Sequence, residues 1–336
     1  MAESQAETAR MPDLGALART LLIRLRGAAI VIPFVALFVV LSLTSEPFFE
    51  KDNLRNILDQ QSKYLIVASA GTLVLIAGGL DLSVGAVFLL GGVAAAKVAL
   101  VSGSVAGILV GVGVGLAIGL ANGMLVTIFR INPLIATLAM SFVVAGLTGL
   151  ITKGLLVTLL PLPGKPGNPG FAKFATSHFL GITSQIWVMV IVVLALGLVL
   201  ARTRAGRYMY AAGGNPAAAR LAGVRVGLIR TLTYVLSGGA AALAGVLLVS
   251  QVGVAGQSAG GSDFTFAVLA GIIVGGTSIL GGEGAVWRSV VGVLFIALIG
   301  NGFDLLGYDP LYKQIVQGGL ILLAVAIDAW TRTARR

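Results

Sequence analysis

Residues 105–128 read VAGILVGVGVGLAIGLANGMLVTI and contain no charged residue. A helix of about 20 mostly apolar residues is long enough to cross the hydrocarbon core of a bilayer. Because lipid cannot hydrogen-bond a bare backbone, such a segment must satisfy its own amides and carbonyls, as a helix does. The segment therefore predicts a membrane-spanning helix.

The composition of the whole chain also indicates a membrane protein. Of its 336 residues, 57% are hydrophobic and 11% are charged, and the mean hydropathy is +1.00. An ordinary soluble domain is about 25% charged. The net charge is +10, and the basic residues lie between the apolar runs with no aromatic residues interleaved among them. This pattern argues against nucleic acid as a partner.

Few residues in the sequence are suited to catalysis. The chain has no cysteine and one histidine, His178, which excludes thiol chemistry and disulfides and argues against a histidine metal cluster. We therefore expect a protein that is not an enzyme, with no catalytic residue, metal site or cofactor in this chain.

The same length criterion predicts an all-α polytopic fold of about ten membrane-spanning helices, within a transmembrane domain over residues 28–328. No cleavable signal pattern precedes the first of them, so residues 1–27 are expected to be an uncleaved cytoplasmic tail. Ten spans also place the tail 329–336 in the cytoplasm. The predicted spans are residues 28–45, 64–80, 82–101, 105–128, 134–152, 185–201, 231–251, 265–281, 286–305 and 312–328.

The arginines support this orientation, with both termini inside. Fifteen basic residues fall in the predicted inner segments and all are arginines, whereas the other eight, seven lysines and Arg55, lie in or near outer segments. Cytoplasmic loops of membrane proteins carry an excess of basic residues. The bias therefore favours the orientation with both termini in the cytoplasm.

Glycine-rich runs occur in two of the predicted spans, at residues 107–123 and 271–282. Glycines at close spacing allow helix backbones to approach one another. Such runs also mark bent or half-spanning helices that line a transport pathway. The sequence leaves both interpretations open.

Two segments lie between spans on the outer side. Residues 46–63 mix apolar and charged residues, which predicts a short amphipathic helix at the outer interface. Residues 153–184 form an outer loop, and its four prolines between 160 and 170 predict irregular structure.

The longest inner segment, residues 202–230, has six arginines and no acidic residue; we call it the basic hairpin. Within it, Asn215 is a favoured N-cap, Pro216 suits the first helical position and Gly223 suits the C-terminal end. These residues predict a helix of about two turns, which is unstable alone and needs a partner surface. The alternative is an ordered positive loop that only fixes orientation.

Four stretches resemble ABC-importer permeases of the ribose and xylose type, in the order of that family. GRYMYAAGGNPAAARLAGVRVGLIRTLTYVLSGGAAALAG (206–245) is similar to the family's cytoplasmic loop and the following span. The others are IAGGLDLSVGAV (76–87), ANGMLVTIFRINPLIATLAM (121–140) and FAVLAGIIVGGTSILGGEGAV (266–286).

The resemblance implies an inner-membrane permease that imports a monosaccharide by alternating access. It implies inverted halves of the vitamin B12-permease type, a second permease copy, two ATPase subunits and an outer sugar-binding protein. The chain itself has no G-x-x-x-x-G-K-[ST] motif, so ATP and Mg²⁺ are expected in the partner ATPase. The segment Asn215–Gly223 would be the coupling helix, with Pro216 and Ala218 within it and Arg220 and Leu221 as contacts.

Five polar residues are candidates for the pathway or its gate. Asp81 and Ser83 either cap the third span or form a gate, because a carboxylate facing lipid is costly. Asn301 and Asp304 either meet the outer interface or line a vestibule for sugar hydroxyls. Gln257 lies in a Gly/Ser-rich outer loop that the resemblance places near the pathway mouth.

Other functions remain open at this point. A permease for branched-chain amino acids or nucleosides belongs to the same class and looks similar overall. An ion-coupled secondary carrier also uses repeats and broken helices, but Asp81, Asp304 and Lys97 all map near span ends. An intramembrane enzyme would need a nucleophile with a base, or a metal cluster, inside the spans. One loop histidine and no cysteine argue against this function.

Overall fold

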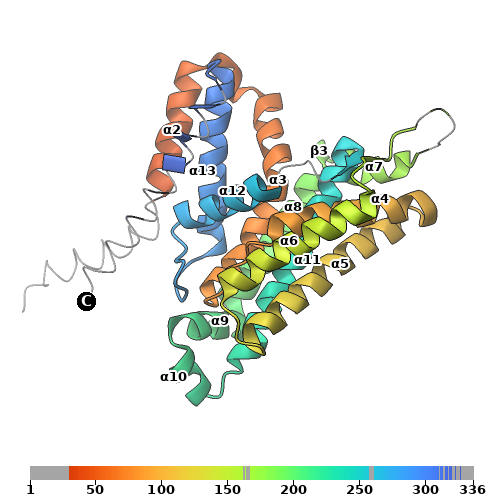
Figure 1. Ribbon diagram of the computed structural model, residues 1–336. Coiled ribbons are helices and arrows are strands. Elements are labelled where there is room, and N and C mark those ends of the chain that lie inside the picture. Colours follow the sequence, from red (N-terminus) through yellow and green to blue (C-terminus); the bar gives the residue numbers. More distant parts are fainter. Residues whose placement is uncertain are drawn as a thin grey trace, which may run out of the picture.

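The computed structural model describes residues 30–161, 163, 167–256 and 261–309, and single positions between 311 and 326 (Figure 1). Helices make up most of this part of the chain. They are α2 (Val31–Thr44), the 3-10 helix η1 (Glu46–Phe49), α3 (Lys51–Ile76), α4 (Val84–Ser102), α5 (Ser104–Thr127), α6 (Pro133–Thr152), α7 (Pro169–Thr176), α8 (Ser184–Arg202), α9 (Arg204–Gly214), α10 (Pro216–Leu221), α11 (Val226–Val252), α12 (Gly261–Val274) and α13 (Val286–Leu305).

Four short strands form two antiparallel pairs beside the helices. β1 (Val157–Thr158) pairs with β4 (Val254–Ala255), which joins the segment after α6 to the end of α11. β2 (His178–Phe179) and β3 (Ile182–Thr183) form a hairpin before α8. The outer segment 153–184 is thus not wholly irregular as predicted, because α7 and the hairpin of β2 and β3 order much of its second half.

Six of the described helices are long and apolar enough to cross a membrane: α4, α5, α6, α8, α11 and α13. The helices α2 and α12 are apolar but shorter, and α3 is long but begins with charged residues. The described part of the chain thus shows a predominantly helical membrane protein. The tails 1–27 and 329–336, and most of the predicted span 312–328, lie outside the described residues.

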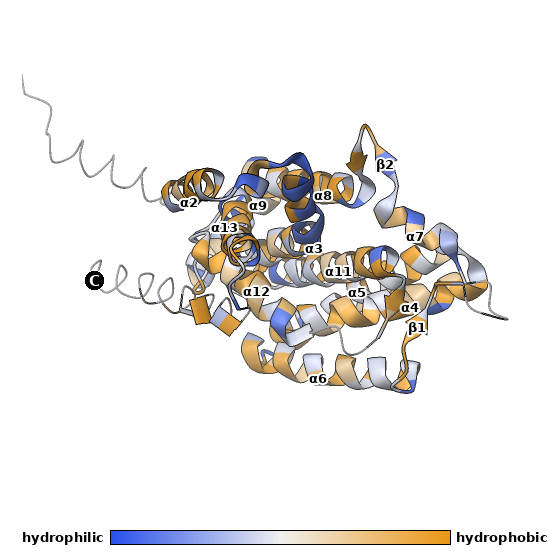
Figure 2. Cartoon of the chain, turned by 90° about the horizontal axis from the view of Figure 1, so that it is seen from above, coloured by the Kyte–Doolittle hydropathy of each residue, from blue (hydrophilic) through white to orange (hydrophobic). Residues whose placement is uncertain are grey.

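Helix α11 lies at the centre of the structure and packs against α3, α4 and α5. Most of its residues are buried, as are nearly all residues of α3 from Ser62 to Ile76. The helices at the periphery, such as α2 and α6, are mainly apolar and leave large side chains exposed (Figure 2). This arrangement suits a protein whose outer surface meets lipid.

The glycines of α5 pack against the neighbouring helices, as the first of the two interpretations predicts. Gly107, Gly111, Gly115 and Gly119 recur every four residues and are all buried. A Cβ atom at Gly115 would lie 2.3 Å from the carbonyl oxygen of Gly238 in α11. The run therefore brings two backbones into contact, which larger residues would prevent.

The second glycine-rich run behaves differently. Helix α12 ends at Val274, and the chain stays irregular until α13 begins at Val286. Gly276, Gly281 and Gly282 all have positive φ, a conformation that side chains with a Cβ rarely adopt. The predicted span 265–281 is therefore wrong at its end, and this segment fits the interpretation of a short, interrupted helix.

The predicted boundary between residues 63 and 64 is also wrong. Instead of an interfacial helix over 46–63 and a separate span over 64–80, one continuous helix, α3, runs from Lys51 to Ile76. The chain is then irregular over residues 77–83, before α4. Polar side chains in the first half of α3 pair with polar groups of other helices, among them Asn53 with Asn301 and Lys63 with Gln251.

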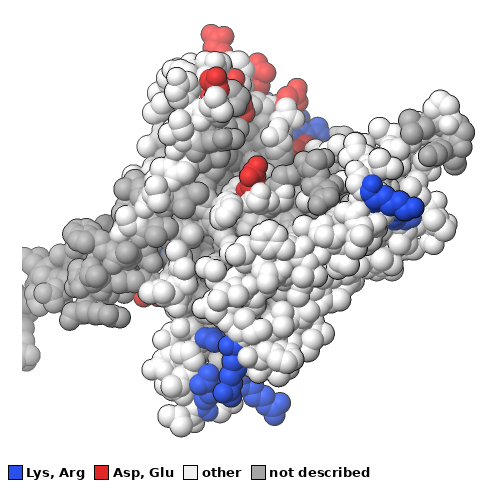
Figure 3. Space-filling view, in the orientation of Figure 1, with Lys and Arg blue, Asp and Glu red and all other residues white. Residues whose placement is uncertain are grey.

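Charged side chains gather at opposite ends of the molecule (Figure 3). Arginines surround α9 and α10 at one end, and acidic residues on the same face gather above η1 and the start of α3 at the other. Glu46 and Asp52 lie in the first turns of these two helices. This polarity agrees with the prediction that the basic hairpin faces the cytoplasm.

The tight contact at Gly115 gives a prediction with a matched control two residues away. We expect Gly115→Ala to lower the free energy of unfolding by about 1–3 kcal/mol, because the added methyl group meets a backbone carbonyl. Gly113 is exposed, and a methyl group added there would have no neighbouring atom within 4 Å, so Gly113→Ala should be neutral or stabilising. Thermal unfolding in detergent measures the stability of both variants. An equal loss of stability in the two would contradict this packing.

Candidate functional site

The predicted short helix in the basic hairpin is present, and both of its predicted ends are confirmed. The side-chain oxygen of Asn215 accepts a hydrogen bond from the backbone amide of Ala218 at 3.0 Å, and Pro216 is the first residue of α10. Gly223 follows the helix with φ of +82°. The amide of Val224 then donates to the carbonyl of Ala219 at 2.9 Å, which closes the last turn.

Helix α10 projects from the end of the molecule (Figure 1), and most of its residues are exposed. Ala219 is its buried residue, whereas Arg220 is exposed and Leu221 is 92% exposed. A six-residue helix gains little stability from propensity alone. Arg220 and Leu221 are therefore both accessible to a partner at this end of the molecule.

A second helix in the basic hairpin, α9, is absent from the sequence prediction. It packs against α8, α11 and α3 and buries Gly206, Met209 and Ala212. Tyr210 donates a hydrogen bond to the carbonyl of Gly284 at 2.8 Å, beyond α12. The small or apolar residues at every third position are the signal that sequence reasoning overlooked.

Asp81 and Ser83 lie together in the irregular segment 77–83, which we call the first break. Asp81 is 5% exposed and accepts hydrogen bonds from the amide and hydroxyl of Ser83 at 3.0 and 2.6 Å. Its other oxygen accepts from Ser237 of α11 at 2.8 Å. Ser83 is the N-cap residue of α4 but makes no side-chain capping bond, so Asp81 fastens the break to α11 instead.

Other side chains satisfy the backbone of the first break. The Tyr234 hydroxyl accepts from the amide of Leu80 at 3.2 Å and donates to its carbonyl at 3.1 Å. Thr137 of α6 accepts from the amide of Leu82 at 3.0 Å. An irregular backbone among membrane helices is tolerated where protein groups supply its hydrogen bonds, and here α6 and α11 supply them.

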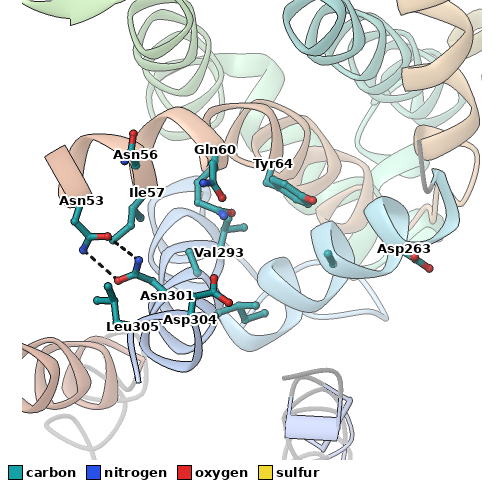
Figure 4. A pocket seen from close by; sticks show the side chains of 15 residues that line it. Asn53, Asn56, Ile57, Gln60, Tyr64, Asp263, Val293, Asn301, Asp304 and Leu305 are labelled. Carbon is teal, nitrogen blue, oxygen red and sulfur yellow. Dashed lines mark hydrogen bonds between the residues drawn. The ribbon is translucent and has the colours of Figure 1, made fainter. Parts of the chain in front are cut away.

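A polar pocket opens between α3, α12 and α13 (Figure 4). We call it the outer pocket; its volume is about 550 Å³. Asn301 and Asp304 both line it, and Asn301 forms a reciprocal amide pair with Asn53, with N···O distances of 2.8 and 3.2 Å. Its other lining residues are Asn56, Ile57, Gln60, Gln61, Tyr64, Asp263, Ala267, Val293, Ile296, Ala297, Gly300 and Leu305.

The five pathway candidates therefore do not form one site: two line the outer pocket, and two others lie together elsewhere. Asn301 and Asp304 share the outer pocket, whereas Asp81 and Ser83 belong to the first break, and Gln257 lies outside the described residues. Sequence reasoning missed the contribution of α3. The signal that could have found it is a row of polar residues at helical spacing, from Asn53 through Gln60 to Tyr64.

A second polar cluster lies beside the outer pocket and holds a buried lysine. Lys63 is 6% exposed, and its ammonium donates to Gln251 of α11 at 2.7 Å and to the carbonyl of Asp59 at 3.1 Å. The Asp59 carboxylate accepts from Gln185 of α8 at 3.0 Å. The cluster therefore joins the outer parts of α3, α8 and α11 through charged hydrogen bonds.

Comparison with known proteins identifies the group to which this architecture belongs. Residues 53–325 match a family model described as the permease component of branched-chain amino acid transport systems. The chain belongs to this permease family. The match covers the outer pocket, the first break and the basic hairpin.

Individual relatives of this permease are sugar permeases. The ribose import permease of Escherichia coli K12 is 37% identical over 305 residues, covering 88% of this chain and 92% of the relative. The ribose import permease of Bacillus subtilis is 38% identical, covering 88% and 91%. The L-arabinose ABC transporter permease of Azospirillum brasilense is 34% identical, covering 92% and 89%.

These comparisons confirm the predicted resemblance to sugar permeases of ABC importers. The protein is a membrane permease subunit of an ABC importer, and permeases of this kind reside in the bacterial inner membrane. The relatives are named as permeases and not as enzymes. No solved structure matches the chain.

The hydrogen bonds of Asp81 lead to a test of its role in the fold. We expect Asp81→Ala to lower the free energy of unfolding by about 1–3 kcal/mol, because it leaves the buried donors of Ser83 and Ser237 unpaired. Asp81→Asn keeps one oxygen acceptor, which can still accept from Ser83, and should lose less stability than Asp81→Ala. Thermal unfolding in detergent measures both, and equal losses would contradict a role for the Ser83 bonds.

Proposed function

We propose that this permease carries a monosaccharide inward through the outer pocket. The observation that carries the proposal is the lining of that pocket, where amides from α3 face an amide and a carboxylate from α13. Side chains of this kind donate to and accept from several hydroxyl groups at once. Relatives that are named for ribose, L-arabinose and D-allose support the same substrate class.

The size and chemistry of the outer pocket suit a small polar substrate that must leave again. Its volume of about 550 Å³ lies within the usual range for small-molecule sites, roughly 300–1,000 Å³. Tyr64 adds an aromatic ring at the inner end of the polar row (Figure 4). Transport needs weak, reversible contacts, so no covalent step or catalytic residue is required.

The energy for transport would enter through α10. Asn215, Pro216, Ala218 and Gly223 give the helix its defined ends, and Arg220 and Leu221 present the exposed surface of the coupling helix to a partner ATPase. That ATPase would bind ATP and Mg²⁺, since this chain lacks the G-x-x-x-x-G-K-[ST] motif. Closure of two such ATPases would press on α10.

The complete importer would contain two permeases, two ATPases and an outer sugar-binding protein, surrounded by lipid. We infer about ten spans in inverted halves, as in vitamin B12-type permeases. The two irregular segments support the inverted halves: each follows a helix, α3 or α12, and precedes a long one, α4 or α13. The amide of Gly282 donates to the carbonyl of Ile76, the last residue of α3, at 2.9 Å. A Cβ atom at Gly281 would lie 2.9 Å from the Cα of Gly78, so the two segments meet.

Asp81 and Ser83 would act as part of the gate, through the shape of the first break. Ser237 donates to Asp81 and so fixes this segment against α11, while Ser83 donates to the same carboxylate. A movement of either element would therefore alter the position of both residues. Gln257 would contribute at the outer mouth of the pathway.

The role of the outer pocket can be tested with Gln60. We expect Gln60→Ala to reduce uptake of radiolabelled ribose about tenfold, because it removes hydrogen bonds to the sugar that are worth about 1 kcal/mol each. Leu58→Ala, on the same helix and outside the pocket, should leave uptake unchanged. Cells that express the permease with its ATPase and binding protein provide the assay.

Two results of this uptake assay would count against the proposal. Parent-like uptake by the Gln60 variant would place the pathway elsewhere. Strong inhibition of ribose uptake by excess unlabelled leucine would favour an amino acid permease instead.

The coupling surface can be tested with Leu221. We expect Leu221→Ala to reduce the copurified ATPase at least tenfold at limiting concentration, because a fully covered leucine side chain is worth about 1.5–3 kcal/mol. Its exposure means that the permease alone should fold normally. Leu109→Ala, at an exposed leucine of α5, is the matched control. Undiminished copurification of the Leu221 variant would remove α10 from the interface.

A further inference from the structure

Three backbone segments meet where the basic hairpin joins the rest of the protein. They are the end of α9, the first break (77–83) and the second break, residues 275–285. A Cβ atom at Gly213 would lie 1.8 Å from the carbonyl oxygen of Ile76 and 2.7 Å from the amide of Gly282. A Cβ atom at Gly281 would lie 2.9 Å from the Cα of Gly78. The segments touch through bare backbone, so a shift of one displaces the others.

One arginine connects this junction to α11. The Nε of Arg230 donates to the carbonyl of Ala77 in the first break at 2.9 Å, and its Nη2 donates to the carbonyl of Ala212 in α9 at 3.2 Å. Arg230 is partly buried. The other arginines of the basic hairpin are exposed; they are residues 202, 204, 207, 220 and 225.

Arg230 is the first of three residues that hold the first break along one face of α11. Tyr234 and Ser237 follow it by four and seven residues, a helical spacing that places all three on one face. Tyr234 holds Leu80 and Ser237 holds Asp81. These two contacts involve only the break, whereas Arg230 also holds α9.

We propose that Arg230 transmits movement of the coupling helix to the first break. This rests on the proposed function, in which α10 docks on an ATPase. The rigid fork of a guanidinium can bond two diverging carbonyl oxygens at once, so α9 and the break move together when ATPase closure displaces the hairpin. Arg230 is thus a positioning residue that acts through Asp81 and its neighbours, without contact to substrate or ATP.

The test uses the assembled importer in liposomes with Arg230→Lys. A lysine keeps the charge but lacks the planar fork, so it cannot reproduce both contacts. We expect normal copurification of the ATPase and normal basal ATP hydrolysis. The sugar transported per ATP hydrolysed should fall roughly tenfold, the size expected for losing one charged hydrogen bond.

Two control variants separate transmission from general stabilisation. Arg130→Lys changes an exposed arginine in the turn between α5 and α6 and should keep the parent ratio of sugar to ATP. Tyr234→Phe removes a contact to the break that does not involve α9. If Arg230 only stabilises the first break, Tyr234→Phe should lower the ratio of sugar to ATP as much as Arg230→Lys does. If Arg230 transmits movement, the ratio should be lower in Arg230→Lys than in Tyr234→Phe.

Each remaining outcome has a defined meaning. A parent-like ratio in Arg230→Lys, with a coupled parent, would overturn the proposal while leaving the proposed function intact. Failure of both Arg230→Lys and Arg230→Gln to assemble would also overturn it, in favour of a purely structural role. A parent that copurifies with no ATPase would instead refute the proposed function itself.

Discussion

The structure depends on how the protein satisfies backbone groups where its helices stop. A bare amide or carbonyl in hydrocarbon costs several kcal/mol, yet the chain is irregular over residues 77–83 and 275–285. Tyr234 and Arg230 of α11 bond the first of these segments, and Gly282 of the second bonds Ile76 of α3. The interruptions are therefore stabilised by the contacts that the two segments make with each other and with α3 and α11.

Close packing of glycines makes these contacts possible. Hydrogen bonds form only when the backbones come within reach, and a Cβ at Gly213 or Gly281 would prevent that approach. Glycine loses more conformational entropy on folding than other residues, so the surrounding helices must hold the junction in place. The backbones of these segments are therefore in direct contact, with no side chain between them. Such a contact suits a place where the displacement of one segment has to move another.

Local features of this protein are predictable from sequence, whereas features that need distant partners are not. The cap at Asn215 and the turn at Gly223 depend on neighbouring residues, and both are present as predicted. The continuity of α3 is not predictable in this way, because its buried Lys63 is satisfied by Gln251, 188 residues away. Only part of the outer pocket is predictable, for the same reason. Asn301 can be picked out from the sequence, but its partner Asn53 lies on another helix, far away in the chain.

The central position of α11 explains how events on the two faces of the protein can be linked. This helix has 27 residues, or about 40 Å at 1.5 Å per residue, which is more than the hydrocarbon core requires. Near its start, Arg230 contacts Ala212 of α9, and near its end Gln251 contacts Lys63 beside the outer pocket. Under our proposal, a displacement of α9 reaches α11 through Arg230. A shift of α11 would in turn alter its contacts with α3, which supplies one wall of the outer pocket.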